Sequence, residues 1–113
     1  YTEHYYYTDV KTINRDQDPL AGQINWYVVG ERRPGGDPNV DFQGIRVFTW
    51  NMRKHRYETA YRTRGMRGVY PLEIGQEGAS PTFRVYELAE DGTTKVARDF
   101  IMQGVIVREK KDS

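Results

Sequence analysis

Residues 45–50 read Ile45-Arg46-Val47-Phe48-Thr49-Trp50, and residues 83–88 repeat this pattern as Phe83-Arg84-Val85-Tyr86-Glu87-Leu88. Each copy continues through a polar turn and a second extended stretch to a Gly-Val pair, at 68–69 and at 104–105. A repeat of this kind is typical of a duplicated supersecondary unit that cannot bury its apolar face alone. The sequence therefore predicts an internal hairpin repeat, with units at about 44–74 and 82–108.

Length and composition favour one β domain that spans 1–113. The 113 residues suffice for a single core, and the scarcity of leucine argues against a helical protein. Valine, isoleucine, threonine and tyrosine favour strands. With a net charge of +1 and no cysteine, the chain gives no strong nucleic-acid signal and has no thiolate metal site or disulfide. No apolar run approaches the roughly 18 residues of a transmembrane segment.

Alternation of apolar and polar residues predicts seven to eight short strands and no helix. A firm strand is expected over 22–30, whereas 14–19 and 75–81 are expected to be turns or loops. Asp91-Gly92 is a strong hairpin signal. The predicted fold class is all-β, a single antiparallel barrel or sandwich, with a propeller fragment as the alternative. The other expected strands are 5–10, 42–50, 57–64, 69–72, 82–88, 95–100 and 104–108.

Basic residues are concentrated in the first repeat unit. Residues 44–76 hold seven lysines and arginines against two glutamates. A basic hairpin tip close to further arginines could bind phosphates or carboxylated sugars. Alternatively, the arginine stems cover apolar surface while their charged ends pair with acidic loops. If the tip is a contact surface, its cations should project with little acidic pairing. The candidate binding residues are Arg53, Lys54, His55, Arg56, Arg64 and Arg67.

Aromatic side chains at strand spacing offer a second candidate site. Trp26, Trp50 and Tyr57 could line the cavity of a ligand-binding barrel. The same spacing also suits side chains that fill a core or form cross-strand pairs. Asn14, Asp16 and Asp18 have the spacing that begins a calcium loop, but the following glycine and the distant glutamate are missing. We interpret them as a solvated turn, and we expect no metal and no cofactor.

Catalytic patterns are missing from the sequence. It has no nucleophile-elbow serine, no pair of histidines at metal-binding spacing, and no glycine-rich phosphate loop. We therefore expect that the chain is not an enzyme.

The stretch from Phe48 to Arg62, followed by Gly68-Val69-Tyr70-Pro71, resembles a segment of uncharacterised bacterial proteins. In those proteins a bacterial Src-homology-3-like module precedes a small β-domain of unknown role, and the proteins are exported or associated with the envelope. The resemblance covers about residues 44–72 and implies an accessory β-module. It assigns no catalytic or binding residue to this chain.

Together these observations favour a non-catalytic accessory module of a larger bacterial envelope or exported protein. Such a module would mediate contacts with a protein or a cell-wall polymer, and the basic hairpin at 51–67 is its expected contact surface. The main alternative is a small β-barrel that binds a lipid or a sugar. A polyanion or nucleic-acid binder is the third possibility, which the small net charge disfavours.

Overall fold

The computed structural model describes residues 5–111, and within this range the chain forms β-strands and no helix. This confirms the predicted all-β class. The first sheet has the order β1-β2-β3-β4 and the second the order β5-β6-β7-β8, and every ladder is antiparallel. The strand bounds are β1 Tyr6–Asp18, β2 Gly22–Arg32, β3 Gly44–Asn51, β4 Arg56–Arg62, β5 Gly68–Glu77, β6 Ser80–Leu88, β7 Lys95–Gln103 and β8 Ile106–Lys110.

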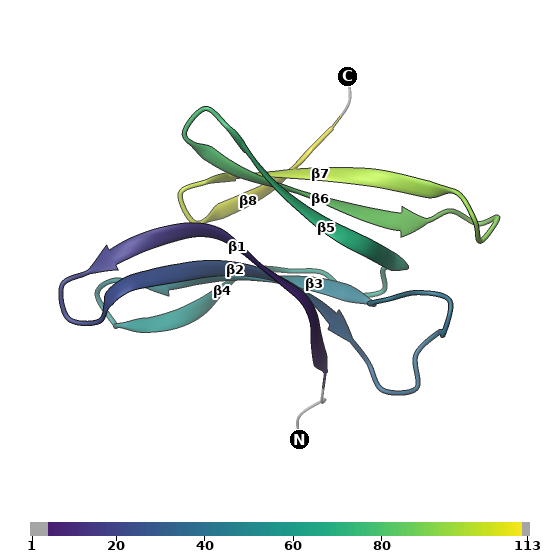
Figure 1. Ribbon diagram of the computed structural model, residues 1–113, viewed down its shortest axis with the longest axis horizontal. Coiled ribbons are helices and arrows are strands. Elements are labelled where there is room, and N and C mark those ends of the chain that lie inside the picture. Colours follow the sequence, from purple (N-terminus) through teal and green to yellow (C-terminus); the bar gives the residue numbers. More distant parts are fainter. Residues whose placement is uncertain (1–4, 112–113) are drawn as a thin grey trace.

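The two sheets lie one above the other and enclose a common apolar core (Figure 1). Alternate residues of β2 and β3 face this core from the first sheet, as do those of β6 and β7 from the second. Val47 and Phe100 illustrate the arrangement, because each is completely buried and they come from opposite sheets. The remaining core residues include Ile13, Trp26, Val28, Phe42, Ile45, Met66, Leu72, Phe83, Val85 and Met102.

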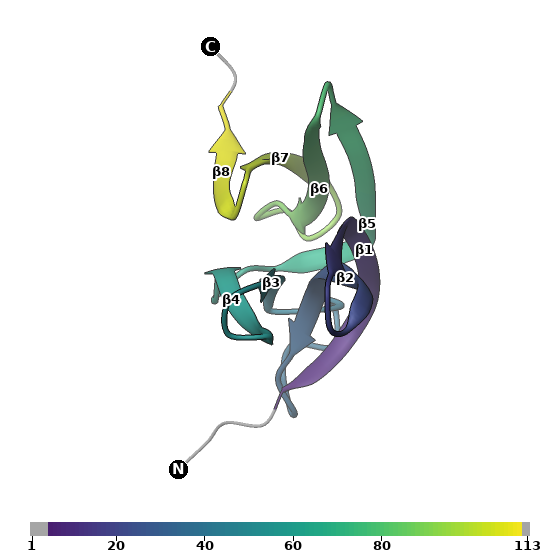
Figure 2. The same cartoon turned by 90° about the vertical axis from the view of Figure 1, so that its left-hand side faces the viewer.

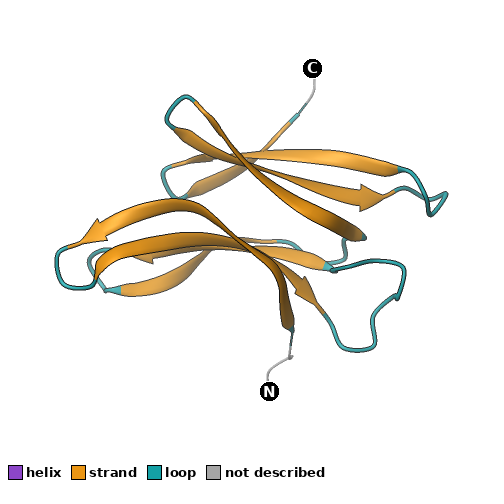
Figure 3. Cartoon of the chain, viewed as in Figure 1, coloured by secondary structure: helices purple, strands orange, loops and turns teal. Residues whose placement is uncertain are grey.

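The sheet edges fall on two sides of the molecule. Figure 2 shows β4 and β8 on one side and β1 and β5 on the other. The longest connection, between β2 and β3, lies at one end together with the link from β4 to β5 (Figure 3). The turns β1–β2, β3–β4 and β7–β8 gather at the opposite end. Loops from both sheets therefore meet at this second end.

A close approach of two segments joins the sheets near the β4–β5 link. Phe42 and Gly68 form an isolated antiparallel bridge, in which Gly68 N donates to Phe42 O at 3.0 Å. A Cβ atom on Gly68 would overlap the buried ring of Phe42. The position therefore requires glycine for lack of space and not for an unusual backbone angle.

The repeated segments occupy β3 and β6, and each contributes a fully buried valine, Val47 and Val85, to the core. Their surroundings differ, however. Strand β3 pairs with β2 and β4, whereas β6 pairs with β5 and β7. The first Gly-Val pair opens β5 in the other sheet, but the second lies at the turn that precedes β8. The two copies thus share an inner strand with a neighbour on each side. The segments that follow this strand occupy different places in the two copies.

The expected loop at 75–81 is wrong. Strand β5 continues through Gly75 to Glu77, and β6 begins at Ser80, so that the turn is confined to Gly78 and Ala79. Proline breaks a ladder only where its missing N–H would have to donate. Pro81 pairs with Gln76 close to the hairpin end, where the loss is small.

The expected turn at 14–19 is also wrong over most of its length. Strand β1 runs to Asp18 as the partner of β2, with irregular register after Thr8 and after Thr12. The polar residues of this stretch alternate between exposed and less exposed positions, as in a strand. Asn14 pairs with Trp26 of β2. A ladder to a firm neighbouring strand therefore overrides the turn preference of the isolated segment.

Candidate binding surface

The β3–β4 turn is held in one shape by Asn51. Its side-chain oxygen accepts hydrogen bonds from the backbone N–H groups of Arg53 at 3.0 Å and Lys54 at 2.9 Å. The N–H of His55 donates to the backbone oxygen of Asn51 at 2.8 Å. His55 has a φ of 52°, the left-handed conformation that closes the turn. We call residues 51–56 the hairpin tip.

Asp18 fastens the hairpin tip to the neighbouring β1–β2 turn. Its buried carboxylate accepts hydrogen bonds from the backbone N–H groups of Leu20 at 2.8 Å and Ala21 at 3.0 Å. The same carboxylate accepts from Trp50 Nε1 at 2.7 Å and lies 2.9 Å from His55 Nδ1. These donors satisfy an anion that would otherwise be costly to bury. The interpretation of Asp18 as part of a solvated turn is therefore wrong.

These donors hold the pKa of Asp18 well below its ordinary value of 3.8, with the Trp50 hydrogen bond as the largest cause. Because the folded pKa is the lower one, the ionised carboxylate stabilises the fold at pH values above 3.8. This contribution is lost as the pH falls from that value through the folded pKa. We expect Asp18→Asn to reduce the free energy of unfolding at neutral pH and to flatten its fall in acid. Urea unfolding of both proteins at a series of pH values tests this, and parallel pH profiles would contradict it.

Cations project from the hairpin tip with little acidic pairing. Arg53 and Lys54 are exposed, and in the described part of the chain neither side chain makes an ion pair within 4.0 Å. Arg56 makes one exposed contact, 3.6 Å from Glu58. Such an exposed pair contributes little and leaves the cation accessible. His55, in contrast, is turned towards Asp18 and serves the fold.

The other predicted cations lie elsewhere. Arg64 and Arg67 follow the far end of β4, whose length separates them from the hairpin tip by roughly 20 Å. Arg64 is exposed, whereas Arg67 donates to the backbone oxygen of Ala89 at 3.3 Å and lies 3.9 Å from Asp37. The structure therefore does not bring the six candidate residues together on one surface.

Two further cations of the basic segment pair with one buried carboxylate. Arg62 donates to Glu31 at 2.8 and 3.3 Å, and Arg46 lies 3.9 Å from it. Glu31 is 2% exposed, so both arginines shield its charge on the outer face of the first sheet. Much of the local positive charge predicted from the sequence is therefore used within the fold.

The three aromatic residues predicted to line a cavity do not lie together in one site. Trp26 is packed in the core at 6% exposure and lines none of the grooves described below. Trp50 and Tyr57 meet edge to face, with ring centroids 5.0 Å apart. Tyr57 also donates its hydroxyl to the backbone oxygen of Asn25 at 3.0 Å, and burial raises its pKa. Trp50 and Tyr57 thus form a cross-strand pair that supports the hairpin tip.

An open groove of about 510 Å³ lies between the hairpin tip and the β7–β8 turn. Trp50, Met52 and Val105 supply apolar surface, while Arg53 and Glu58 supply charge. The sequence does not reveal this groove, because Val105 is distant in the chain and adjoins it only in the folded protein. The other lining residues are Thr49, Asn51, Thr59 and Ala60.

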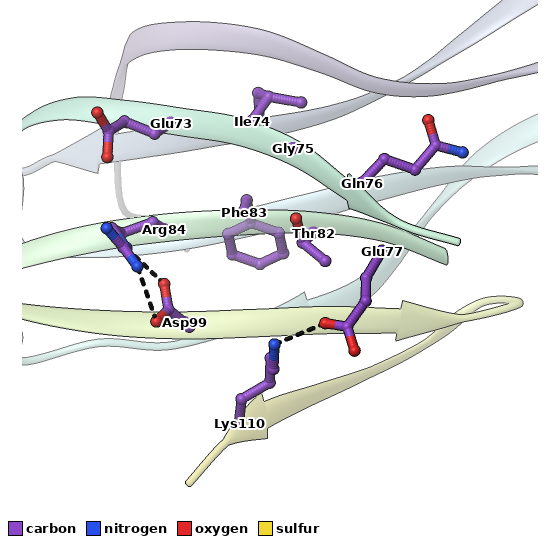
Figure 4. A pocket seen from close by; sticks show the side chains of 10 residues that line it. All are labelled: Glu73, Ile74, Gly75, Gln76, Glu77, Thr82, Phe83, Arg84, Asp99 and Lys110. Atoms are coloured by element: carbon purple, nitrogen blue, oxygen red, sulfur yellow. Dashed lines mark hydrogen bonds and ion pairs between the residues drawn. The ribbon is translucent and has the colours of Figure 1, made fainter. Parts of the chain in front are cut away.

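A second groove, of about 310 Å³, lies on the second sheet (Figure 4). Four of its five charged side chains form two ion pairs. Arg84 donates to Asp99 at 2.6 and 3.2 Å, and Lys110 donates to Glu77 at 2.6 Å. A ligand would have to compete with these pairs, which makes this groove the weaker candidate. A third groove, also of about 310 Å³, is lined by Asp9, Lys11, Tyr70 and Pro71.

Within residues 5–111 no cluster of three or more histidine, cysteine, aspartate or glutamate residues could hold a metal ion. In the same range no helix has the length and apolar character needed to cross a membrane. Comparison of the chain with family models, with curated proteins and with solved structures finds no match.

Proposed function

We propose that this chain is a non-catalytic accessory module of a larger bacterial envelope or exported protein, and that the hairpin tip contacts an acidic protein or cell-wall polymer. The observation that carries the proposal is the display of Arg53 and Lys54. Both are exposed without an ion-pair partner within 4.0 Å among the described residues, although the same chain neutralises Arg46 and Arg62 internally.

The rigidity of the hairpin tip supports this role. Asn51 fixes the backbone beneath the two cations, and Asp18 ties the tip to the adjacent turn. A contact surface held in one conformation loses less conformational entropy when it binds. Tip residues selected for the fold alone would not need two exposed cations without an ion-pair partner.

We further infer that the two sheets form a sandwich and not a closed barrel, because each sheet ends in two edge strands, β1 and β4 or β5 and β8. The alternative function, binding of a lipid or sugar inside a barrel, receives less support. Trp26 belongs to the packed core, and the grooves around the described residues are open to solvent.

Reversal of both tip charges tests the proposed function. We expect Arg53→Glu combined with Lys54→Glu to weaken binding to purified peptidoglycan or to poly-L-glutamate by about tenfold or more. Binding of the unaltered chain should weaken as salt rises from about 50 to 200 mM, since phosphate or carboxylate contacts are screened. Co-sedimentation and fluorescence titration are the measurements.

The matched control reverses Arg33 and Arg64, which are also exposed but lie at the other end of the molecule. It changes the net charge by the same amount and should alter affinity by less than about threefold. Equal losses in the two double variants would show that only net charge matters. That result, or the lack of binding to either polymer, would overturn the proposed function.

A further inference from the structure

The groove beside the hairpin tip, lined by residues 49–53, 58–60 and Val105, has features that the proposed function does not use. We call it the hairpin groove. Its volume of about 510 Å³ lies within the range of small-ligand and peptide sites. Trp50 forms part of its wall, and the hydrogen bond to Asp18 fixes the position of that ring. This part of the groove wall is therefore held in place without a ligand.

Thr49 lines the groove, and its side-chain hydroxyl has no hydrogen-bond partner within residues 5–111. The residue as a whole is only 4% exposed, but its hydroxyl is not among the fully buried side-chain atoms that lack a partner, so it keeps access to solvent. An accessible hydroxyl can donate one hydrogen bond and accept others. The Thr49 hydroxyl is therefore free to bond a polar group of a ligand in the groove.

The groove runs along the free edge of a sheet. Strand β4 is the last strand of the first sheet, so the backbone groups on its outer side have no ladder partner. Glu58, Thr59 and Ala60, at the middle of β4, line the groove. An unpaired edge beside a side-chain pocket is the arrangement by which sheets accept an extended peptide as an additional strand.

The side chains of the groove define what such a peptide would carry. Met52 is 41% exposed and Val105 is 53% exposed, and both offer apolar surface to one side chain of the peptide. Arg53 offers an unpaired charge, and Lys54 and Arg56 lie next to it. The hydrogen bond from Asn51 lowers the pKa of Glu58, which keeps one negative charge among these three cations. The balance favours an acidic peptide.

We propose that the hairpin groove binds an extended segment of a partner protein, which adds a strand to the β4 edge and places an apolar and an acidic side chain against Val105 and Arg53. The two side chains are two positions apart, because alternate residues of a strand share one face. The peptide backbone matches the spacing of the β4 edge, which a glycan does not. The proposal rests on the proposed role as a contact module and names the class of partner.

The probe is the peptide acetyl-Thr-Val-Thr-Glu-Thr-amide, titrated into the ¹⁵N-labelled chain and followed by NMR. We expect saturable shifts of the backbone amides of residues 58–60 and of Val105. Moving the glutamate one position, so that it leaves the face of the valine, should weaken binding by about fivefold or more. Shifts confined to the second-sheet groove, or no saturable shift, would overturn the proposal.

Backbone pairing is tested with two N-methylated forms of the peptide. Alternate residues of an added antiparallel strand direct their N–H groups towards its partner. Methylation of residues 2 and 4 and methylation of residues 1, 3 and 5 of the peptide should therefore have opposite effects, with one form losing binding and the other retaining it. Equal affinity of the two forms would exclude strand addition.

Variants of the groove complete the test. Thr49→Val keeps the shape of the side chain and should weaken peptide binding by about fivefold, because the hydroxyl is lost. The matched control, Thr82→Val in the second-sheet groove, should leave affinity unchanged. Equal affinity for both variants would remove Thr49 from the site and contradict the proposal.

The remaining outcomes separate this inference from the proposed function. If chitotriose and not the peptide shifts residues 58–60, the occupant is a glycan and the peptide assignment is wrong. If these amides shift with protein concentration alone, a second copy of the chain occupies the edge. If the peptide fails but polymer binding remains sensitive to the charges of Arg53 and Lys54, the inference fails while the proposed function stands.

Discussion

Replacement of Phe100 by alanine is expected to reduce the free energy of unfolding by about 3–5 kcal/mol. Phe100 is fully buried in β7, and its ring stacks on Phe83 with centroids 4.9 Å apart and an interplanar angle of 9°. It also contacts Tyr61 of β4, at 5.7 Å between centroids, and so joins the two sheets. The truncation would remove the ring contacts and leave a cavity between the sheets. Urea unfolding followed by tryptophan fluorescence measures the loss.

The matched control for Phe100 is an aromatic residue outside the core. Tyr6 is 63% exposed, and its replacement by alanine should change the free energy of unfolding by about 0.5 kcal/mol or less. Similar unfolding midpoints for the two variants would mean that the sheets do not pack through Phe100. Because small domains are stable by only about 5–15 kcal/mol, the Phe100 variant should be partly unfolded well below the temperature at which the control unfolds.

Alanine at Gly68 is expected to cost about 1–3 kcal/mol, although the added group is only a methyl. The methyl would overlap the ring of Phe42, which is completely buried and cannot move into solvent. We expect a lower urea midpoint with an unchanged slope, since the unfolded chain is hardly affected. Gly35→Asn is the control, because the space around Gly35 is open and asparagine tolerates its φ of 74°.

A double-mutant cycle assigns the cost to the contact itself. In a Phe42→Leu background the smaller side chain leaves room for the methyl, so Gly68→Ala should cost less than in the unaltered chain. The difference between the two costs is the coupling energy, expected to be on the order of 1 kcal/mol for residues in contact. Purely additive costs would show that Gly68 is required for another reason.

The sequence allowed a sound prediction of strands that alternate in burial. Val28 and Val47 lie opposite each other in β2 and β3, and both are core residues of strands that the sequence predicted at 22–30 and 42–50. Such strands are predictable because one face is apolar along the whole segment. Turn residues were less informative. Gly75 and Pro81 lie within strands β5 and β6, close to a hairpin end that tolerates residues unsuited to a central strand.

The candidate site could be predicted only in part. The local pattern placed Arg53 and Lys54 at a hairpin tip, which the structure confirms. The role of Asp18 was not predictable, because it depends on Trp50 and His55, which approach it only after the first and second hairpins lie side by side. The separation of Arg64 from the tip, in contrast, follows from the length of the strand predicted at 57–64. Contacts between distant segments therefore determine the site.

The strict order of strands within each sheet has a consequence for how the chain folds. Each ladder joins neighbours in the sequence, so every hairpin can form after closure of its own connecting loop. Hairpins of this type form in about 1–10 μs, well before a typical β-domain completes its folding. The slow step should then be the docking of two meanders through their apolar faces. During synthesis the first four strands would emerge from the ribosome before the last four. The first sheet could then form while its apolar face is not yet covered by the second sheet.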